Sequence, residues 1–126
     1  MVLSLFARIS ADTVDQIVNQ VNNGLKADAN RCFILEGYSQ GAAATVNALP
    51  KLTGAAFTAV KGVFLIGDPE HKSGLACNVD ATGGTTTLNV NGLSAYAGGI
   101  PSNWVSKTMD VCAYVSGSLM SGSELY

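Results

Sequence analysis

The sequence is short of charged residues, which make up 13% of its 126 positions, and basic residues are not in excess. Its formal net charge of −2 provides no electrostatic attraction for nucleic acid or for an anionic membrane surface. It also lacks an apolar run of the roughly eighteen residues that a membrane-spanning helix needs. Because 48% of the residues are hydrophobic, the composition favours a globular protein with a buried core. We therefore expect no nucleic-acid partner and no membrane span.

Histidine and cysteine are also scarce. The only histidine is His71, and the three cysteines are Cys32, Cys77 and Cys112. An odd number of cysteines leaves at least one without a disulfide, unless all three are buried, unreactive thiols. The first eight residues include an apolar patch but no basic residue before it and no clear cleavage site. They do not predict a signal peptide.

The chemically most informative stretch runs from residue 32 to residue 45. An apolar run there is followed by the pattern G-x-S-x-G, formed by Gly37, Ser39 and Gly41, and then by alanine-rich sequence. This setting predicts a strand, a very tight turn and a helix, with the serine presented at the turn. Ser39 is then a candidate nucleophile, and the backbone N–H of Gln40 is a candidate oxyanion donor at the helix start. The spacing does not match G-x-G-x-x-G and there is no P-loop lysine, so a flavodoxin-like nucleotide binder is the weaker alternative.

Helical and strand patterns alternate over the first half of the chain. Apolar residues recur at helical spacing over residues 10–27, and a second helix is expected to continue over 42–49, until Pro50. We expect a short helix over 55–59, a buried strand over 60–66 and a last strand over 106–113. This alternation predicts an α/β fold, with a parallel sheet covered by helices on both faces. From residue 67 the sequence becomes irregular, with a long excursion over 79–105 and a Ser/Gly-rich, irregular tail over 115–126.

The stretch Gly37-Tyr38-Ser39-Gln40-Gly41-Ala42-Ala43-Ala44-Thr45 and several later segments resemble the cutinase family, which includes fungal acetylxylan esterases. The further segments that match are Ala55-Ala56-Phe57, Val60 to Pro69, His71 to Gly74, Ile100-Pro101-Ser102 and Asp110-Val111-Cys112. The similarity runs from about Ser10 to Tyr114. The resemblance implies a three-layer α/β/α hydrolase with flavodoxin-like strand order, forming one domain over 1–126 that is incomplete at both ends.

The resemblance also implies an activity. Family members are secreted carboxylic ester hydrolases, in which a serine is acylated by an ester and the acyl-enzyme is then hydrolysed, without a metal or an organic cofactor. Ser39 takes the place of that nucleophile, and Gln40 that of an oxyanion donor through its backbone N–H. The implied substrates are cutin-like polyesters, short-chain acyl esters or acetylated xylan. The implied location is extracellular.

The other members of the family's catalytic triad have no counterparts in this sequence. Aligned on Cys112, the family's aspartate falls at Ser116 and its next cysteine at Leu119. The family's histidine lies nearer the C-terminus than His71, which matches a structural loop residue, and we expect Asp110 to face solvent on its strand. The cysteines that pair with Cys32 and Cys112 in the family are absent as well. We therefore expect weak or no catalysis, the alternative being a non-catalytic α/β fragment or pseudoenzyme that acts by binding alone.

Overall fold

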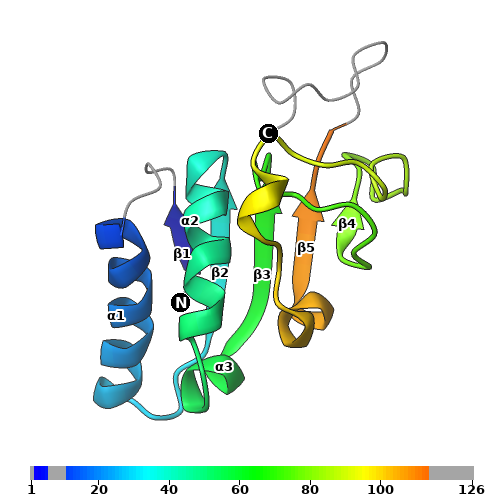
Figure 1. Ribbon diagram of the computed structural model, residues 1–126. Helices are drawn as coiled ribbons and strands as arrows, with labels where there is room; N and C mark the ends of the chain where they lie inside the picture. The colour runs from blue at the N-terminus through cyan, green and yellow to red at the C-terminus, as the bar shows by residue number, and fades with distance from the viewer. Residues whose placement is uncertain (1, 6–10, 114–126) are drawn as a thin grey trace.

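A five-stranded sheet forms the centre of the fold (Figure 1). The computed structural model describes residues 2–5 and 11–113. Each pair of neighbouring strands in the sheet is parallel, and the strand order is β1-β2-β3-β5-β4. The strands are β1 (Val2–Leu5), β2 (Phe33–Tyr38), β3 (Val60–Ile66), β4 (Asn78–Val79) and β5 (Thr108–Val111). The carboxyl ends of all the strands therefore lie at the same edge of the sheet.

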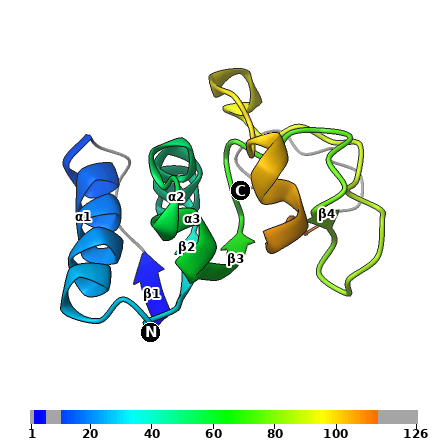
Figure 2. The same cartoon turned by 90° about the horizontal axis from the view of Figure 1, so that it is seen from below.

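The α-helices of the described residues lie on one face of this sheet (Figure 2). They are α1 (Ala11–Ala27), α2 (Gln40–Ala48) and α3 (Ala55–Ala59), and short 3₁₀ helices form η1 (Leu49–Lys51), η2 (Ala95–Ala97) and η3 (Ser102–Lys107). Because β1, β2 and β3 follow one another across the sheet, right-handed connections place α1, α2 and α3 on the same side. None of the helices in the described part of the chain is long and apolar enough to cross a bilayer.

The sequence predicted the class of this fold and most of its elements. The α/β fold with a parallel sheet is confirmed, as are helices over 11–27 and 55–59 and a strand over 60–66. The last strand is shorter than expected, because residues 102–107 form the 3₁₀ helix η3 and pairing with β3 begins at Thr108. Strands β1 and β4 were not expected. The predicted irregular tail over 115–126 lies outside the described residues.

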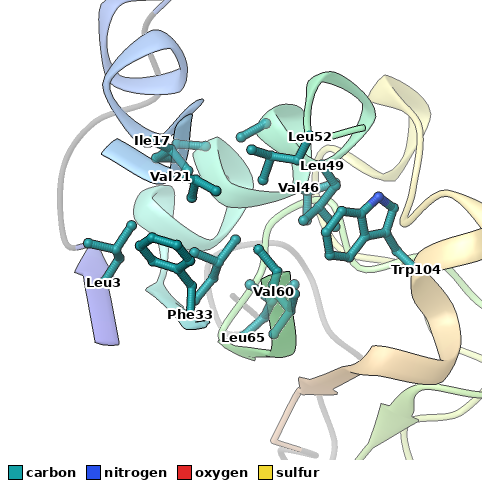
Figure 3. Packing of buried hydrophobic residues seen from close by; sticks show 14 of the residues in the cluster. Leu3, Ile17, Val21, Phe33, Val46, Leu49, Leu52, Val60, Leu65 and Trp104 are labelled. Carbon is teal, nitrogen blue, oxygen red and sulfur yellow. The ribbon is translucent and has the colours of Figure 1, made fainter. Parts of the chain in front are cut away.

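The core lies between the sheet and the helices that cover it (Figure 3). Side chains alternate along β2, so that Phe33 and Leu35 are fully buried against the helices. The first turn of α2 carries alanines that are also fully buried, and two of them, Ala42 and Ala44, belong to the same core cluster as Phe33 and Leu35. Small side chains let the helix axis approach the sheet closely. This close packing fixes where α2 begins relative to the end of β2.

The opposite face of the sheet presents apolar side chains to solvent in the described structure. Ile34 and Tyr38 on β2 are 44% and 47% exposed, Ile66 on β3 is 40% exposed, and Met109 on β5 is 47% exposed. Register places these residues on neighbouring strands, since Tyr38 pairs with Ile66, and Phe64 pairs with Met109. The described residues therefore supply a helical layer to only one side of the sheet.

Trp104 on η3 is the buried core residue that packs next to β5. Its side chain is 1% exposed, and its ring meets that of Phe57 edge to face, with the ring centroids 4.8 Å apart. The ammonium group of Lys107 lies 3.8 Å from the centre of the Phe57 ring and donates hydrogen bonds to the carbonyls of Phe57 and Val60. Trp104 thus joins the segment before β5 to α3 and the start of β3.

Replacing Trp104 by alanine is expected to lower the free energy of unfolding by about 3–5 kcal/mol, because it removes a fully buried aromatic side chain and leaves a cavity. Urea unfolding followed by circular dichroism measures the change. The control is Leu93→Ala, since Leu93 is 67% exposed and its loss should change stability by less than about 0.5 kcal/mol. Equal effects of the two substitutions would contradict the packing described for Trp104.

Candidate functional site

Ser39 lies at the turn between β2 and α2 in a strained backbone conformation. Its φ and ψ angles are 55° and −120°, and it is the only residue other than glycine with positive φ in the described residues. Its backbone N–H donates a hydrogen bond to the carbonyl of Ile66 at the end of β3, at 2.9 Å. The predicted strand, tight turn and helix are therefore present, and the turn is tied to the neighbouring strand.

The turn requires glycine at position 37. A Cβ atom at Gly37 would lie 2.6 Å from Cα of Ala42 and 2.8 Å from the carbonyl oxygen of Gly41. Both contacts are with backbone atoms, which cannot move away as the end of a flexible side chain can. The missing side chain therefore allows the first turn of α2 to pack directly against the last residues of β2.

The first backbone N–H groups of α2 lie next to Ser39. The carbonyl of Ser39 accepts hydrogen bonds from the N–H groups of Ala42, at 3.0 Å, and Ala43, at 3.3 Å. The N–H groups of Gln40 and Gly41 precede this first intrahelical bond, at the positive end of the helix dipole. Ser39 is half-buried and Gln40 is exposed. The hydroxyl-bearing residue and these donors thus share the carboxyl edge of the sheet.

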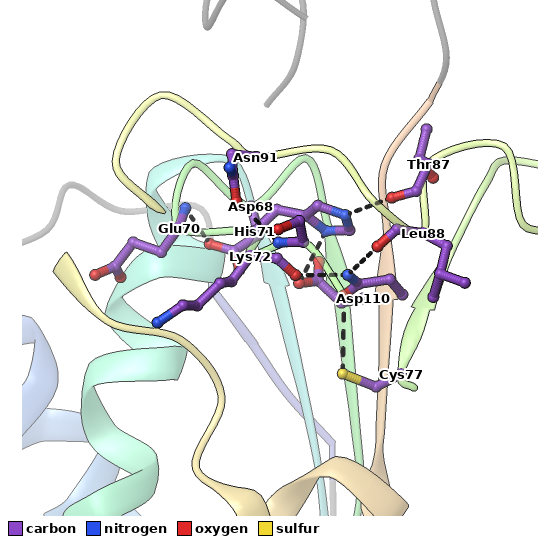
Figure 4. Close-up of polar contacts among 11 residues, drawn as sticks. Asp68, Glu70, His71, Lys72, Cys77, Thr87, Leu88, Asn91 and Asp110 are labelled. Carbon is purple, nitrogen blue, oxygen red and sulfur yellow. Dashed lines mark hydrogen bonds and ion pairs between the residues drawn. The ribbon is translucent and has the colours of Figure 1, made fainter. Parts of the chain in front are cut away.

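A second group of polar side chains lies at the same edge and is fully buried (Figure 4). Nδ1 of His71 is 3.0 Å from Oδ2 of Asp110, and Nε2 of His71 is 3.1 Å from the carbonyl oxygen of Thr87. Asp68 follows the end of β3, and its Oδ1 accepts a hydrogen bond from the backbone N–H of Glu70 at 2.8 Å. We call Asp68, His71 and Asp110 the buried acid–histidine cluster.

The contacts of His71 determine where its protons lie. A carbonyl oxygen only accepts hydrogen bonds, so Nε2 must carry a proton towards Thr87. Nδ1 faces the carboxyl group of Asp110 across 3.0 Å. Burial lowers the pKa of His71, but the hydrogen bond and charge of Asp110 and the Thr87 carbonyl outweigh it, so the pKa is raised overall. The contact with Asp110 therefore favours the charged form of His71.

The third member of the cluster keeps its own proton. Burial raises the pKa of Asp68 to about 8, and the negative charge of Asp110 adds to this effect. At neutral pH, Asp68 is therefore protonated. Glu70 extends the arrangement towards α2, because its Oε2 accepts a hydrogen bond from Nδ2 of Asn47 at 2.6 Å. Burial also raises the pKa of Glu70.

The structure corrects one prediction from the sequence, which concerns Asp110. It also shows that Asp110 and His71, which the sequence analysis treated separately, lie in contact. Asp110 was expected to face solvent, but it is fully buried, because the loop that carries His71 folds over its strand. His71 has the structural character expected of it. Its Nε2 is taken up by Thr87, so this histidine does not serve Ser39 in this arrangement. The signal that could have located the cluster is the placement of Asp68 and Asp110 at the carboxyl ends of two parallel strands.

The cysteines take no part in the site. No disulfide joins Cys32, Cys77 and Cys112, all of which lie in the described residues. Burial, with the negative charge of Asp110 as the next cause, raises the pKa of both Cys77 and Cys112 to about 12. Both are therefore protonated, unreactive thiols. Within residues 2–5 and 11–113, no three His, Cys, Asp or Glu side chains are grouped so as to hold a metal ion.

Substitution of Gly37 by alanine should destabilise the protein by about 1–3 kcal/mol, since the new Cβ atom overlaps the backbone of α2. The matched control is Gly62→Ala on the adjacent strand, where the nearest atom to a new Cβ lies 4.0 Å away. That change should leave stability unaltered or raise it slightly, because alanine restricts the unfolded chain. Urea unfolding of the two variants measures both values. A Gly37→Ala protein as stable as Gly62→Ala would refute the close approach.

The buried cluster makes stability depend on pH. Asp68 holds its proton up to about pH 8 when folded but loses it near pH 4 when unfolded, so the unfolded chain binds fewer protons between these values. The free energy of unfolding should therefore fall as pH rises from about 4 to about 8. The raised pKa of His71 acts in the same direction, and that stabilisation is lost as pH rises through its folded pKa.

Asp68→Asn should flatten this pH dependence, because an amide can accept from Glu70 and donate towards Asp110 without titrating. Denaturant unfolding at a series of pH values between 4 and 8 measures the slope. The control is Asp12→Asn, which removes an exposed carboxylate on α1 and should leave the slope as it is. An unchanged slope in Asp68→Asn would show that Asp68 ionises normally in the folded protein.

Comparison with known proteins places this geometry in a family. The family model described as Cutinase matches residues 4–117. A solved structure described as a novel cutinase-like protein from Cryptococcus sp. is 63% identical, with a TM-score of 0.83, over 91% of this chain and 58% of that chain. The catalytic core domain of acetyl xylan esterase from Trichoderma reesei is 26% identical, with a TM-score of 0.62, over 87% of this chain and 57% of that one.

A further acetylxylan esterase structure shares the fold, with a TM-score of 0.67 at 22% identity, over 90% of this chain and 58% of that one. The chain therefore spans less than two thirds of the length of each of these solved structures. Comparison with curated proteins gave no match. The family model covers most of the sequence, including the Ser39 turn and the buried cluster, and the chain belongs to the cutinase family.

Proposed function

We propose that this chain carries the nucleophile of a cutinase-type carboxylic ester hydrolase, and that Ser39 is that nucleophile. The observation that carries the proposal is the conformation of Ser39, with positive φ at the apex of a G-x-S-x-G turn between a strand and a helix. Such strain is retained where it presents a reactive side chain. Membership of a family with esterases among its solved relatives supports the same reaction class.

In the proposed reaction, the Ser39 hydroxyl attacks the ester carbonyl and its proton passes through solvent to the departing alkoxide, which leaves as the alcohol. Water then hydrolyses the acyl-enzyme, which releases the acid and restores the serine. The negative charge that develops on the carbonyl oxygen is stabilised by the backbone N–H of Gln40, which lies at the start of α2. The helix dipole has the favourable sign at this end. Because an ester group is neutral, its binding beside Ser39 requires no charged side chain.

The proposed reaction has no built-in base among the described residues. His71 is the only histidine in the sequence, and its two nitrogen atoms contact Asp110 and Thr87. The sequence position that aligns with the family's aspartate, Ser116, lies outside the described residues. Without a base beside Ser39, the described residues alone support only weak hydrolysis, through the oxyanion donor and substrate binding. We propose that this chain supplies the nucleophile and one oxyanion donor for the hydrolysis of short-chain acyl esters, acetylated xylan or cutin-like polyesters outside the cell.

Hydrolysis of a short-chain p-nitrophenyl ester, with and without added imidazole, tests this proposal. Imidazole can act as the missing base at Ser39, so we expect it to raise the rate by at least about tenfold, since general-base catalysis contributes about a hundredfold or more when the base is positioned. Ser39→Ala should show only the reaction of imidazole itself with the ester, and the rate of the parent protein above this background is the contribution of Ser39.

Ser73→Ala is the matched control, because it removes the hydroxyl of an exposed serine in the segment that follows β3. This variant should behave as the parent protein. A fluorophosphonate probe should label the parent and Ser73→Ala proteins, and not Ser39→Ala. If a folded parent protein neither reacts with the probe nor responds to imidazole, Ser39 is not a nucleophile. The alternative that then stands is a non-catalytic protein that acts by binding, which is favoured by the engagement of both nitrogen atoms of His71.

A further inference from the structure

Asp68 lies two residues beyond the carbonyl group that holds the Ser39 turn. That carbonyl belongs to Ile66, the last residue of β3, and it accepts the hydrogen bond from the backbone N–H of Ser39 at 2.9 Å. Gly67 follows with a φ of 66°, and its N–H donates a hydrogen bond to the carbonyl of Val111 at 3.0 Å. The side chain of Asp68 then enters the buried acid–histidine cluster (Figure 4). Only Gly67 therefore stands between the residue that holds Ser39 and this carboxyl group.

The same segment is also bound to helix α2. Oδ1 of Asp68 accepts a hydrogen bond from the backbone N–H of Glu70 at 2.8 Å, and Oε2 of Glu70 accepts one from Nδ2 of Asn47 at 2.6 Å. Nδ2 of Asn47 also donates to the carbonyl of Ala43 in α2, at 2.7 Å. These contacts form a closed ring, which runs from the Ser39 turn through the end of β3 to Asp68 and Glu70, and back through α2. A displacement of Asp68 therefore reaches the Ser39 turn from two sides.

The surroundings of Asp68 suit a neutral carboxyl group. The side chain is fully buried, and its Oδ2 accepts a hydrogen bond from no described residue. Burial raises the pKa of Asp68, and the negative charge of Asp110 raises it further. A carboxylate in this place would have one oxygen without a donor and would be repelled by Asp110. The observed arrangement is therefore the one that fits the protonated form.

Other titratable side chains surround Asp68 in the described structure. They come from its own loop, from β5 and from the residues next to β4 and β5, whereas α2 carries none. They are Glu70, His71, Cys77, Asp110 and Cys112. The two thiols have a pKa of about 12 and stay protonated at pH 9. Because the pKa of His71 is raised as well, a variant of Asp68 is needed to tell the two titrations apart.

We propose that Asp68 is a positioning residue for Ser39: its neutral carboxyl group keeps the end of β3 where Ile66 accepts the Ser39 N–H, and its carboxylate does not. When Asp68 loses its proton to water, the carboxylate moves towards solvent. Gly67 permits this movement because glycine has more backbone freedom than other residues, and the hydrogen bond between Ser39 and Ile66 lengthens. The Ser39 hydroxyl and the N–H of Gln40 then leave the geometry that attack on an ester requires. This consequence for the reaction rests on the proposed role of Ser39.

The rate at which a fluorophosphonate probe labels Ser39 tests the consequence for reactivity. It is measured in the parent and in Asp68→Asn between about pH 5 and 9, and the parent rate is divided by the variant rate, which cancels the intrinsic effect of pH. The ratio should be constant up to about pH 7 and fall by about tenfold at pH 9, since about nine tenths of Asp68 is then ionised at a pKa of about 8. The same ratio taken with Asp12→Asn, an exposed carboxylate on α1, should stay constant. A constant ratio with Asp68→Asn, where the probe labels Ser39, would overturn the proposal.

Nuclear magnetic resonance measures the hydrogen bond itself, whether or not Ser39 reacts. The scalar coupling between the Ser39 nitrogen and the Ile66 carbonyl carbon exists only across this hydrogen bond and weakens as it lengthens. In the parent protein it should decrease with the same midpoint as the carboxyl carbon signal of Asp68, and in Asp68→Asn it should stay constant. The control is the coupling from the Arg31 nitrogen to the Asp28 carbonyl carbon, across a bond of 3.1 Å before β2, which should not change.

The two measurements separate the role of Asp68 from the proposed function. Failure of the probe to label Ser39 at any pH would contradict its role as a nucleophile, and the coupling would then decide about Asp68 alone. A coupling that is independent of pH would overturn the proposal. A coupling that titrates in Asp68→Asn as in the parent would also overturn it, because His71 would then be the titrating group. If Asp68→Asn does not fold, the parent protein still decides, since unequal midpoints of the coupling and the Asp68 carboxyl signal overturn the proposal.

Discussion

The structure depends on the contact between the backbones of β2 and α2 at Gly37. Where a side chain would overlap Ala42, its absence lets the helix begin directly above the strand. The buried alanines that follow keep the two elements close along the length of α2. The chain can make this turn only if the residue between them adopts an unusual backbone conformation, and Ser39 is that residue. Packing therefore decides the geometry of the reactive residue.

A second constraint holds the long segment between β3 and β5 against the same edge. This segment has little regular structure, and hydrogen bonds and charges take the place of packing. Asn47 on α2 binds Glu70, Asp68 binds the backbone of Glu70, and His71 joins Asp110 on β5. Buried polar groups are tolerated only when they have partners, and here His71 and Asp110 face each other across 3.0 Å. Removal of either partner would leave the other buried without this contact.

The sequence predicted those helices and strands whose residue pattern is visible within the element itself. The glycine spacing around Ser39 predicts the tight turn. The largely apolar run over 60–66 predicts strand β3. Strands β1 and β4 have four and two residues, and pairing with β2 and β5 defines them more than their own composition does. Asp110 was misjudged for a related reason. Its burial depends on a loop from a distant part of the sequence, which no periodicity along its own strand can reveal.

The position of β5 between β3 and β4 has a consequence for the order of folding. In the described sheet, β4 pairs with β5 alone, although β4 precedes β5 in the sequence. During synthesis, β4 and the loop that carries His71 therefore leave the ribosome before the strand that receives them. Contacts between distant segments form slowly, because the chain between them must first be ordered. The arrival of β5 completes the described sheet and brings Asp110 to His71 in one step, so this half of the described structure is expected to fold last and as a unit.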